Sequence, residues 1–149
     1  MQVLKPTNGY YADVDLRVRY AETDQLGIVY HANYLVWFEI GRAEYCRQNG
    51  FRYTELEDMG YRLVVAEARC RYRNAARYDD VVTVRTSLAD LRRRSVTFRY
   101  VVFDRERALQ LVDGETRHLC TDRSGRSRVI PEPYYTYLSD SVTPPLLDR

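Results

Sequence analysis

The stretch YAETDQLGIVYH, residues 20–31, combines the residue types and spacing best suited to chemistry. Asp24 precedes Gly27, and His31, one of only two histidines in the chain, follows Asp24 by seven positions. A carboxylate can attack an electrophilic carbon or deprotonate a water molecule. The first amides of a helix lack intrahelical partners and can stabilise an oxyanion. Because Asp and Gly are also common turn formers, the residues alone leave both a turn and a catalytic carboxylate open.

Other catalytic or metal-binding groups find little support in the sequence. The chain has no G-x-S-x-G motif and no Cys/His pairing, so serine or cysteine catalysis is not indicated. The three cysteines, Cys46, Cys70 and Cys120, are far apart and without ligand spacing. We therefore expect small buried side chains rather than a disulfide framework or a metal site.

Arginine supplies almost all of the positive charge, because Lys5 is the only lysine. Arginines cluster in RCRYRNAAR (69–77), LRRRS (91–95) and RSGRSR (123–128). Arginine suits phosphate recognition, but solvated basic turns are an equally good interpretation. The net charge of only +2, and the absence of aromatic residues within LRRRS, argue against a nucleic-acid partner.

The length and hydropathy of the chain predict one globular domain over residues 1–149. No apolar run approaches the length needed to span a membrane, so membrane insertion is not expected. The N-terminus lacks the pattern of a secretory signal, so we expect a cytoplasmic protein. The ends, residues 1–12 and 139–149, are expected to be tails.

The apolar pattern predicts one long helix and about five antiparallel strands. Residues 31–49 are apolar nearly all round, which indicates a helix buried on most sides, and Gly41 within it suggests close backbone packing. Alternation predicts strands at 13–20, 62–73, 80–88, 95–103 and 108–121, the last interrupted around Asp113–Gly114. A short amphipathic piece covers 54–59. In the segment 62–73 the expected inward face is Val64, Ala66, Ala68, Cys70 and Tyr72. A helix of this kind requires an α+β fold whose sheet curls around it.

Four segments of this sequence resemble those of a known family. They are Y-x-x-T-D-x-x-G-I-V-Y-H-A-N-Y (20–34), YRNAARYDD (72–80), LRRRS (91–95) and GRSRVIP (125–131). They are similar to the hot-dog-fold acyl-CoA thioesterases, in particular the 4-hydroxybenzoyl-CoA thioesterase branch and the Tol-Pal-associated bacterial thioesterases. The resemblance implies a long helix wrapped by a curved antiparallel sheet. It also implies homodimers paired edge to edge, often assembled into a homotetramer, with active sites at the subunit interface.

The resemblance assigns expected roles to residues around the first motif. Asp24 matches the catalytic carboxylate, and Tyr20 and His31 match two accompanying polar positions. The backbone N–H groups of Tyr30, His31 and Ala32 would stabilise the oxyanion. Whether Asp24 acts as nucleophile or general base stays open.

The resemblance also implies where a coenzyme A ester would bind, with CoA as part of the substrate and no further cofactor. Basic residues would contact its phosphates, and aromatic residues would line the acyl pocket unless they form core. The expected phosphate-binding residues are Arg92, Arg93, Arg94, Arg126 and Arg128. The expected acyl-pocket residues are Tyr30, Tyr34, Trp37, Phe38 and Tyr61. Of two further polar residues, His118 is expected to be structural and Glu67 to form a salt bridge in preference to facing the acyl pocket.

Three functions other than acyl-CoA hydrolysis stay open from the sequence. The same hydrolysis on an acyl carrier protein would use the basic clusters to bind an acidic partner. Hydration or dehydration of an enoyl thioester on the same fold would need an Asp/His pair that is not evident. A non-catalytic acyl-thioester- or protein-binding module is the third, and an intact Asp24 and Gly27 argue weakly against it.

Overall fold

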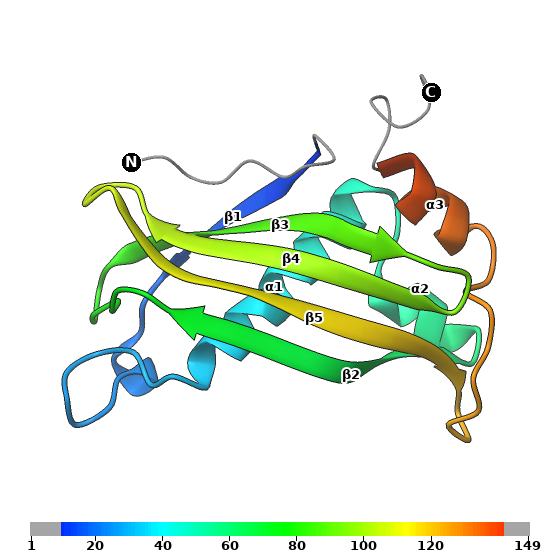
Figure 1. Ribbon diagram of the computed structural model, residues 1–149, viewed down its shortest axis with the longest axis horizontal. Coiled ribbons are helices and arrows are strands. Elements are labelled where there is room, and N and C mark those ends of the chain that lie inside the picture. The colour runs from blue at the N-terminus through cyan, green and yellow to red at the C-terminus, as the bar shows by residue number, and fades with distance from the viewer. Residues whose placement is uncertain (1–9, 142–149) are drawn as a thin grey trace.

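Five antiparallel strands form one sheet in the order β1-β3-β4-β5-β2, and helix α1 lies against one face of it (Figure 1). This computed structural model describes residues 10–141. The elements are β1 (Ala12–Arg17), a 3-10 helix (Tyr20–Glu22), α1 (Asn33–Gln48), α2 (Tyr53–Asp58), β2 (Tyr61–Tyr72), β3 (Val81–Leu91), β4 (Ser95–Asp104), β5 (Leu109–Asp122) and α3 (Tyr134–Ser141). The predicted α+β architecture, with one long helix and five strands, is confirmed.

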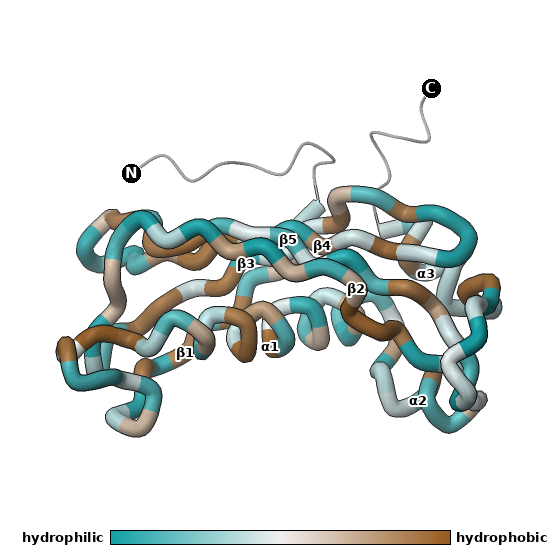
Figure 2. Tube along the Cα trace, turned by 60° about the horizontal axis from the view of Figure 1, so that its bottom comes forward, coloured by the Kyte–Doolittle hydropathy of each residue, from teal (hydrophilic) through white to brown (hydrophobic). Residues whose placement is uncertain are grey.

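Helix α1 forms a separate layer beneath the sheet (Figure 2). It buries Trp37, Phe38 and Tyr45, and Phe38 stacks on Tyr100 of β4 with ring centroids 4.2 Å apart. On its other side Leu35, Val36 and Ile40 remain exposed. The expectation that this helix is buried on most sides is therefore wrong for the described chain, because only the side of α1 that faces the sheet is buried and apolar side chains on its other side are exposed.

Helix α1 passes close to β3 at Gly41. A Cβ atom at this position would overlap the side chains of Thr86 and Val84 on β3. Only glycine allows α1 to lie this close to β3, which confirms the expected close backbone packing.

Strand β2 departs from its predicted faces because of a bulge. The pairing with β5 shifts between Val65 and Glu67, so the residue between them is unpaired and the alternation reverses. Before the bulge, Tyr61 and Leu63 pack against the core, whereas Val64, predicted to face inward, is 47% exposed. After the bulge, the inward position of Cys70 agrees with the prediction.

Other features also differ from the sequence-based expectations, and β3 ends at Leu91 instead of residue 88. The first strand ends at Arg17, because residues 20–22 form the 3-10 helix. The irregularity in β5 lies at residue 111, opposite the step from Val102 to Phe103, and not at Asp113–Gly114. Residues 139–141 belong to α3, and Ala12 is buried in β1, so neither is tail; the rest of both predicted tails, except residues 10–11, lies outside the described residues. Among the described helices none is long and apolar enough to cross a membrane.

Candidate active site

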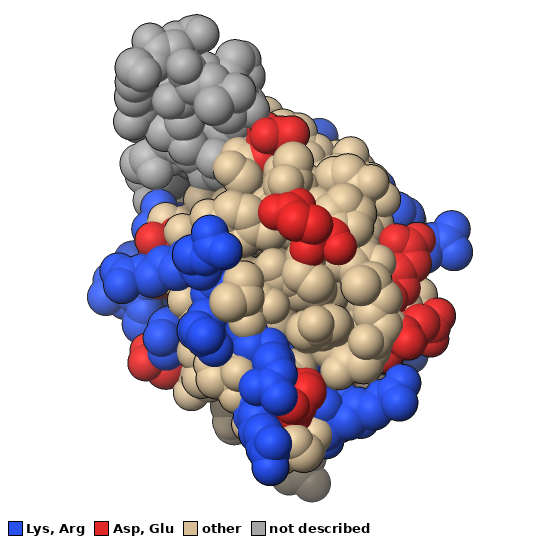
Figure 3. All heavy atoms as spheres, turned by 90° about the vertical axis from the view of Figure 1, so that its right-hand side faces the viewer, with Lys and Arg blue, Asp and Glu red and all other residues tan. Residues whose placement is uncertain are grey.

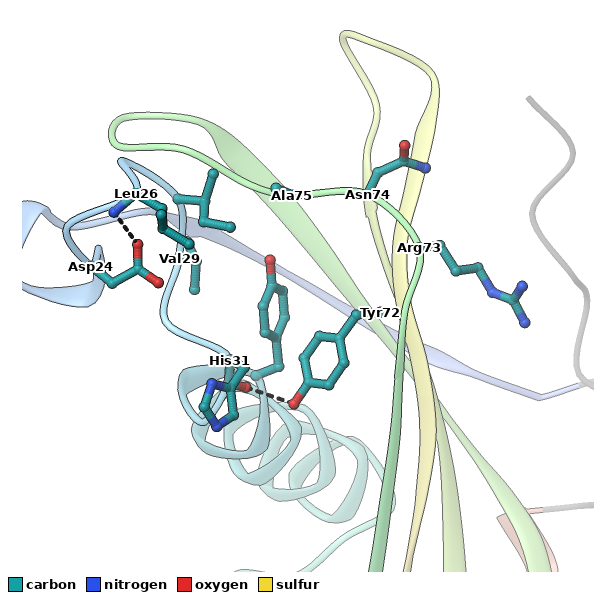
Figure 4. Close-up of a pocket in the computed structure, with 10 residues that line it drawn as sticks. Asp24, Leu26, Val29, His31, Tyr72, Arg73, Asn74 and Ala75 are labelled. Atoms are coloured by element: carbon teal, nitrogen blue, oxygen red, sulfur yellow. Dashed lines mark hydrogen bonds between the residues drawn. The ribbon is translucent and has the colours of Figure 1, made fainter.

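A cavity of about 360 Å³ opens where the loop after β1 meets the start of α1 and the end of β2. Asp24 and His31 lie on it together, and Tyr72 reaches across from β2 toward the helix (Figure 4). The cavity is lined by Asp24, Leu26, Ile28, Val29, His31, Tyr34, Tyr72, Arg73, Asn74 and Ala75. Residues 24–34 and 72–75, far apart in the sequence, therefore form one site.

Asp24 is both a turn former and a cavity residue. Its Oδ1 accepts a hydrogen bond from the amide of Leu26 at 2.8 Å, and its carbonyl accepts one from the amide of Gly27 at 3.0 Å. Gly27 adopts a φ of 79°, which favours glycine. The turn thus uses one carboxylate oxygen, and among the hydrogen bonds of residues 10–141 none uses the other, Oδ2.

The start of α1 presents amides without a side-chain cap. The capping position, Ala32, offers no side-chain acceptor. The amide of Tyr30 donates to the carbonyl of Glu22 at 2.9 Å, so the expectation that it stabilises an oxyanion is wrong. No hydrogen bond among the described residues uses the amides of His31 or Ala32. These two are the donors that a substrate oxygen could meet.

Glu22, which was not singled out from the sequence, stabilises the loop that carries Asp24. The side chain is buried, and its two oxygens accept from the amide of Arg19 and the indole Nε1 of Trp37, each at 2.8 Å. Burial alone would raise the pKa of Glu22, but the hydrogen bonds from Arg19 and Trp37 outweigh it and lower the pKa. Its backbone carbonyl also accepts from the side-chain amide of Asn33 at 2.8 Å. Glu22 therefore joins the Asp24 loop to the first turn of α1.

Tyr72 ties the end of β2 to the same turn. Its hydroxyl donates to the carbonyl of His31 at 2.9 Å, and its ring lies edge-on to those of His31 and Tyr34. Burial and the neighbouring Cys70 raise the pKa of Tyr72 to about 12, so the hydroxyl stays protonated at neutral pH. In the sequence, Tyr72 could have been found as a site residue from its place at the start of the YRNAARYDD segment.

The structure separates several other candidates from this cavity. Tyr20 is 76% exposed, packs against Tyr78 and does not line the cavity. Of the expected acyl-pocket residues only Tyr34 lines it. Trp37 and Phe38 are core residues, and Tyr61 lies at the opposite end of β2.

The basic candidates gather at the end of the sheet away from Asp24. Arg92, Arg93 and Arg94 form the β3–β4 turn, and the loop after β5 folds beside them, since the Arg94 guanidinium donates to Ser127 Oγ at 3.3 Å. Figure 3 views this end of the molecule and shows basic side chains gathered along one side. Arg126 and Arg128 belong to the loop after β5 and are exposed. Within this chain these arginines therefore lie away from Asp24.

The remaining polar candidates do not line this cavity. His118 is buried and its Nε2 lies 2.8 Å from the hydroxyl of Thr116. Glu67 is exposed and forms a long ion pair of 3.9 Å with Arg117. The three cysteines are free, and burial raises the pKa of Cys46 to about 12, which makes it a poor nucleophile. Residues 10–141 contain no group of three or more His, Cys, Asp or Glu side chains placed to hold a metal ion.

Comparison with known proteins places this chain in a family. A model of the thioesterase-like superfamily matches residues 18–144. The acyl-CoA thioester hydrolase YbgC of Escherichia coli is 32% identical over 72% of this chain and 79% of the relative. A hypothetical protein of Thermus thermophilus has a solved structure that is 39% identical, with a TM-score of 0.82 over 87% of this chain and 96% of that chain. The DHNA-CoA thioesterase of Staphylococcus aureus is 27% identical, with a TM-score of 0.84 over 89% and 90% of the two chains. The chain therefore belongs to the thioesterase-like superfamily, and its sheet with the central helix α1 is a hot-dog fold.

Proposed function

We propose that this protein hydrolyses acyl-CoA thioesters, converting acyl-S-CoA and water into a carboxylate and free CoA. The observation that carries the proposal is that Asp24 and the uncapped start of α1 open onto one cavity. The similarity to an acyl-CoA thioester hydrolase of E. coli supports the choice of substrate. A cytoplasmic location is part of the proposal.

In the proposed reaction the thioester carbonyl oxygen accepts hydrogen bonds from the amides of His31 and Ala32. The positive end of the α1 dipole adds to this stabilisation as the oxygen becomes negative. Asp24 Oδ2 either attacks the carbonyl carbon or takes a proton from the attacking water. If Asp24 attacks, the C–S bond breaks to leave an acyl-aspartyl anhydride, which a water molecule then hydrolyses to the carboxylate product and free Asp24. If water attacks, the C–S bond breaks to give the carboxylate product directly. CoA leaves as a thiol, with its proton derived from water. Tyr72 and Glu22 hold the amides and the carboxylate at their relative positions.

We propose that two copies pair through β2. This edge strand has 12 residues and no partner on its outer edge within the described chain, and Val64 and Val65 on it are nearly half exposed. Such an edge is a pairing surface, and antiparallel self-pairing gives a closed twofold dimer. The exposed Leu35, Val36 and Ile40 of α1 offer a second surface through which dimers could form a tetramer.

The dimer would also give the basic end of the molecule a function. Antiparallel pairing sets the β3–β4 turn end of one subunit beside the Asp24 end of its partner. CoA carries a diphosphate and a 3′-phosphate, which suit planar guanidinium groups. The proposed phosphate contacts are Arg92, Arg93, Arg94, Arg126 and Arg128 of the partner subunit.

The same basic end favours one alternative, hydrolysis of an acyl group carried on an acidic acyl carrier protein. That reaction would show salt-sensitive binding of acyl carrier protein and no hydrolysis of acyl-CoA.

A thiol-release assay over aliphatic and aromatic acyl-CoAs tests the proposal. Wild type is expected to release CoA from at least one of these esters, and Asp24→Ala to lose that activity. Asp79→Asn is the matched control, because Asp79 forms an exposed ion pair with Arg17 outside the cavity. If wild type releases no CoA from any ester, the proposal is wrong.

A further inference from the structure

Arg107, in the turn between β4 and β5, joins that turn to the loop between β2 and β3, residues 73–80. Its Nε donates to Asp104 Oδ2 at 2.7 Å, and Asp104 is buried. Its Nη2 donates to Asp80 Oδ2 at 2.8 Å and to the Ala75 carbonyl at 3.4 Å. One guanidinium group therefore holds both the middle and the end of the loop.

This loop is one wall of the cavity at Asp24, since residues 73–75 line the cavity. The next residue, Ala76, donates from its amide to the Tyr34 hydroxyl at 3.2 Å, and its carbonyl accepts from the Val29 amide at 2.9 Å. Tyr34 belongs to the first turn of α1, and Val29 to the segment that links Asp24 to that turn. Figure 1 shows the β4–β5 turn, this wall and the loop after β1 at one end of the sheet. The wall is therefore bonded to both elements that the proposed reaction brings together.

Both turns joined by Arg107 contain a residue in the left-handed backbone region. Asp79 has a φ of 71° and Ala108 a φ of 55°, and they are the two non-glycine residues of positive φ within residues 10–141. For residues with a side chain this conformation costs free energy and persists only where surrounding contacts hold it. Asp79 precedes Asp80 and Ala108 follows Arg107, so the ion pair between these neighbours joins two strained turns. Strain of this kind is concentrated at functional sites.

The charge of Arg107 also acts on a residue of the cavity. The hydrogen bond with Asp104 raises the pKa of Arg107, so the guanidinium is charged. Burial raises the pKa of Tyr34, and two nearby charges act on this pKa in opposite directions, Asp80 raising it and Arg107 lowering it. At the Tyr34 hydroxyl the cation thus offsets a carboxylate charge that would disfavour negative charge on a substrate.

We propose that Arg107 is a positioning residue of the active site, which fixes Tyr34 and the segment before α1 relative to Asp24 by holding residues 75–80. The inference rests on the proposed thioesterase function. Arg107 itself does not line the cavity. Without it the wall can move, and a displacement of about 1 Å at a reacting centre costs up to about 100-fold in rate. Because the wall lines the cavity, binding of the acyl-CoA and selection among acyl groups should change as well.

Arg107→Met, which removes the guanidinium group, tests this role. We expect kcat to fall about tenfold, KM to rise about threefold, and the ratio of kcat/KM between a straight-chain and a ring-containing acyl-CoA to shift about threefold. Arg107→Lys keeps the charge but not the planar fork, and should give intermediate values. Arg105→Met is the matched control, because Arg105 belongs to the same turn but pairs with Asp13 of β1 at 3.0 Å. It should keep the wild-type kinetics.

KM and the ratio between two esters do not depend on how much of the enzyme is folded. A variant that only lost stability would show a lower apparent kcat with both quantities unchanged, and this result for Arg107→Met would overturn the proposal. An equal effect from Arg105→Met would overturn it too.

A double variant tests whether the effect passes through Asp80. Asp80→Asn removes the charge but retains an oxygen that can accept from the Arg77 amide. If Asp80 and Arg107 act as a pair, adding Asp80→Asn to Arg107→Met should lower kcat/KM no further. Losses that multiply would contradict the proposal. Should Arg107→Met fail to fold, Asp80→Asn alone breaks the same ion pair and takes its place in the kinetic comparison.

Amide hydrogen exchange at Ala76 and Val29 supplies a readout that needs no activity. Both amides take part in the bonds of the wall, so Arg107→Met should speed their exchange about tenfold and Arg105→Met should not. If wild type hydrolyses acyl-CoAs but Arg107→Met leaves exchange and kinetics unchanged, only the inference is wrong. If wild type hydrolyses none, the proposed function is wrong and the positioning role with it.

Discussion

Replacing Glu22 by Gln perturbs the support of the active-site loop without changing its shape. The carboxylate accepts from the Arg19 amide and from Trp37 Nε1, each at 2.8 Å, and is only 7% exposed. A glutamine has one oxygen, so its NH₂ group must face one of these two donors. A buried, charge-assisted hydrogen bond is worth about 1.5–3 kcal/mol. We expect Glu22→Gln to lower the free energy of unfolding by about 2 kcal/mol, or the melting temperature by about 4–8 °C for a domain of this size.

The pH dependence of this difference identifies its cause. The pKa of Glu22 is lowered below 4.5 in the folded state, because its hydrogen bonds outweigh burial. The stabilisation by the carboxylate is therefore present above pH 4.5 and is lost as the pH falls through the folded-state pKa. Glutamine does not titrate, so the difference between wild type and Glu22→Gln should shrink in acid.

Thermal unfolding at pH 7 and pH 4, at one protein concentration, measures both effects. Glu44→Gln is the control, because the ion pair and side-chain hydrogen bonds that Glu44 forms within residues 10–141 are with Arg47 and Gln48 on the surface of α1, and this change should alter stability by about 0.5 kcal/mol or less. Equal stability of Glu22→Gln and wild type at pH 7 would refute the assigned role of Glu22, as would a difference that does not change with pH.

Four further substitutions or titrations test other parts of the structure. Gly41→Ala should destabilise the protein by about 1–3 kcal/mol, since its methyl group would overlap β3 side chains; an unchanged melting temperature would contradict this. Tyr72→Phe should lower kcat/KM about threefold to tenfold by releasing the carbonyl that precedes α1, and full activity would argue against that role. The double change Arg92→Ala and Arg93→Ala should raise KM for CoA esters more than for a pantetheine ester; equal effects would rule out phosphate binding. Burial and Arg42 lower the pKa of His118 from 6.5 to about 4, so its contribution to stability is complete above pH 6.5 and declines toward pH 4; an NMR titration midpoint near 6.5 would contradict the burial.

The sequence predicted the architecture because the relevant signals are local. Alternation along the five strands and the apolar helix around Trp37 follow from which side chains must be buried. The bulge in β2 was not predicted from the sequence. Both halves of the strand alternate, and a single unpaired residue exchanges the two faces without leaving a break in the pattern. Helix α3 was not predicted, although the spacing of Tyr134 and Leu138, both buried, could have indicated it.

The sequence identified some residues of the candidate site but not the contacts between them. Asp24 and His31 do lie on one cavity. The use of the Tyr30 amide by Glu22 depends on the path of the loop, which the sequence does not contain. Glu22 itself was overlooked because a glutamate in a polar turn is normally solvated. The distance between the basic turn at Arg93 and Asp24 follows from strand direction, which becomes meaningful only once the sheet order is known.

The most direct test of the account is the activity of Asp24→Asn toward an acyl-CoA that wild type hydrolyses. Asparagine retains an oxygen that can accept from the Leu26 amide, so the turn and the melting temperature should be preserved. The carboxylate is lost, and kcat should fall by about 100-fold or more. If Asp24→Asn folds like wild type and releases CoA at the wild-type rate, then Asp24 is only a turn former and the proposed catalytic site is wrong.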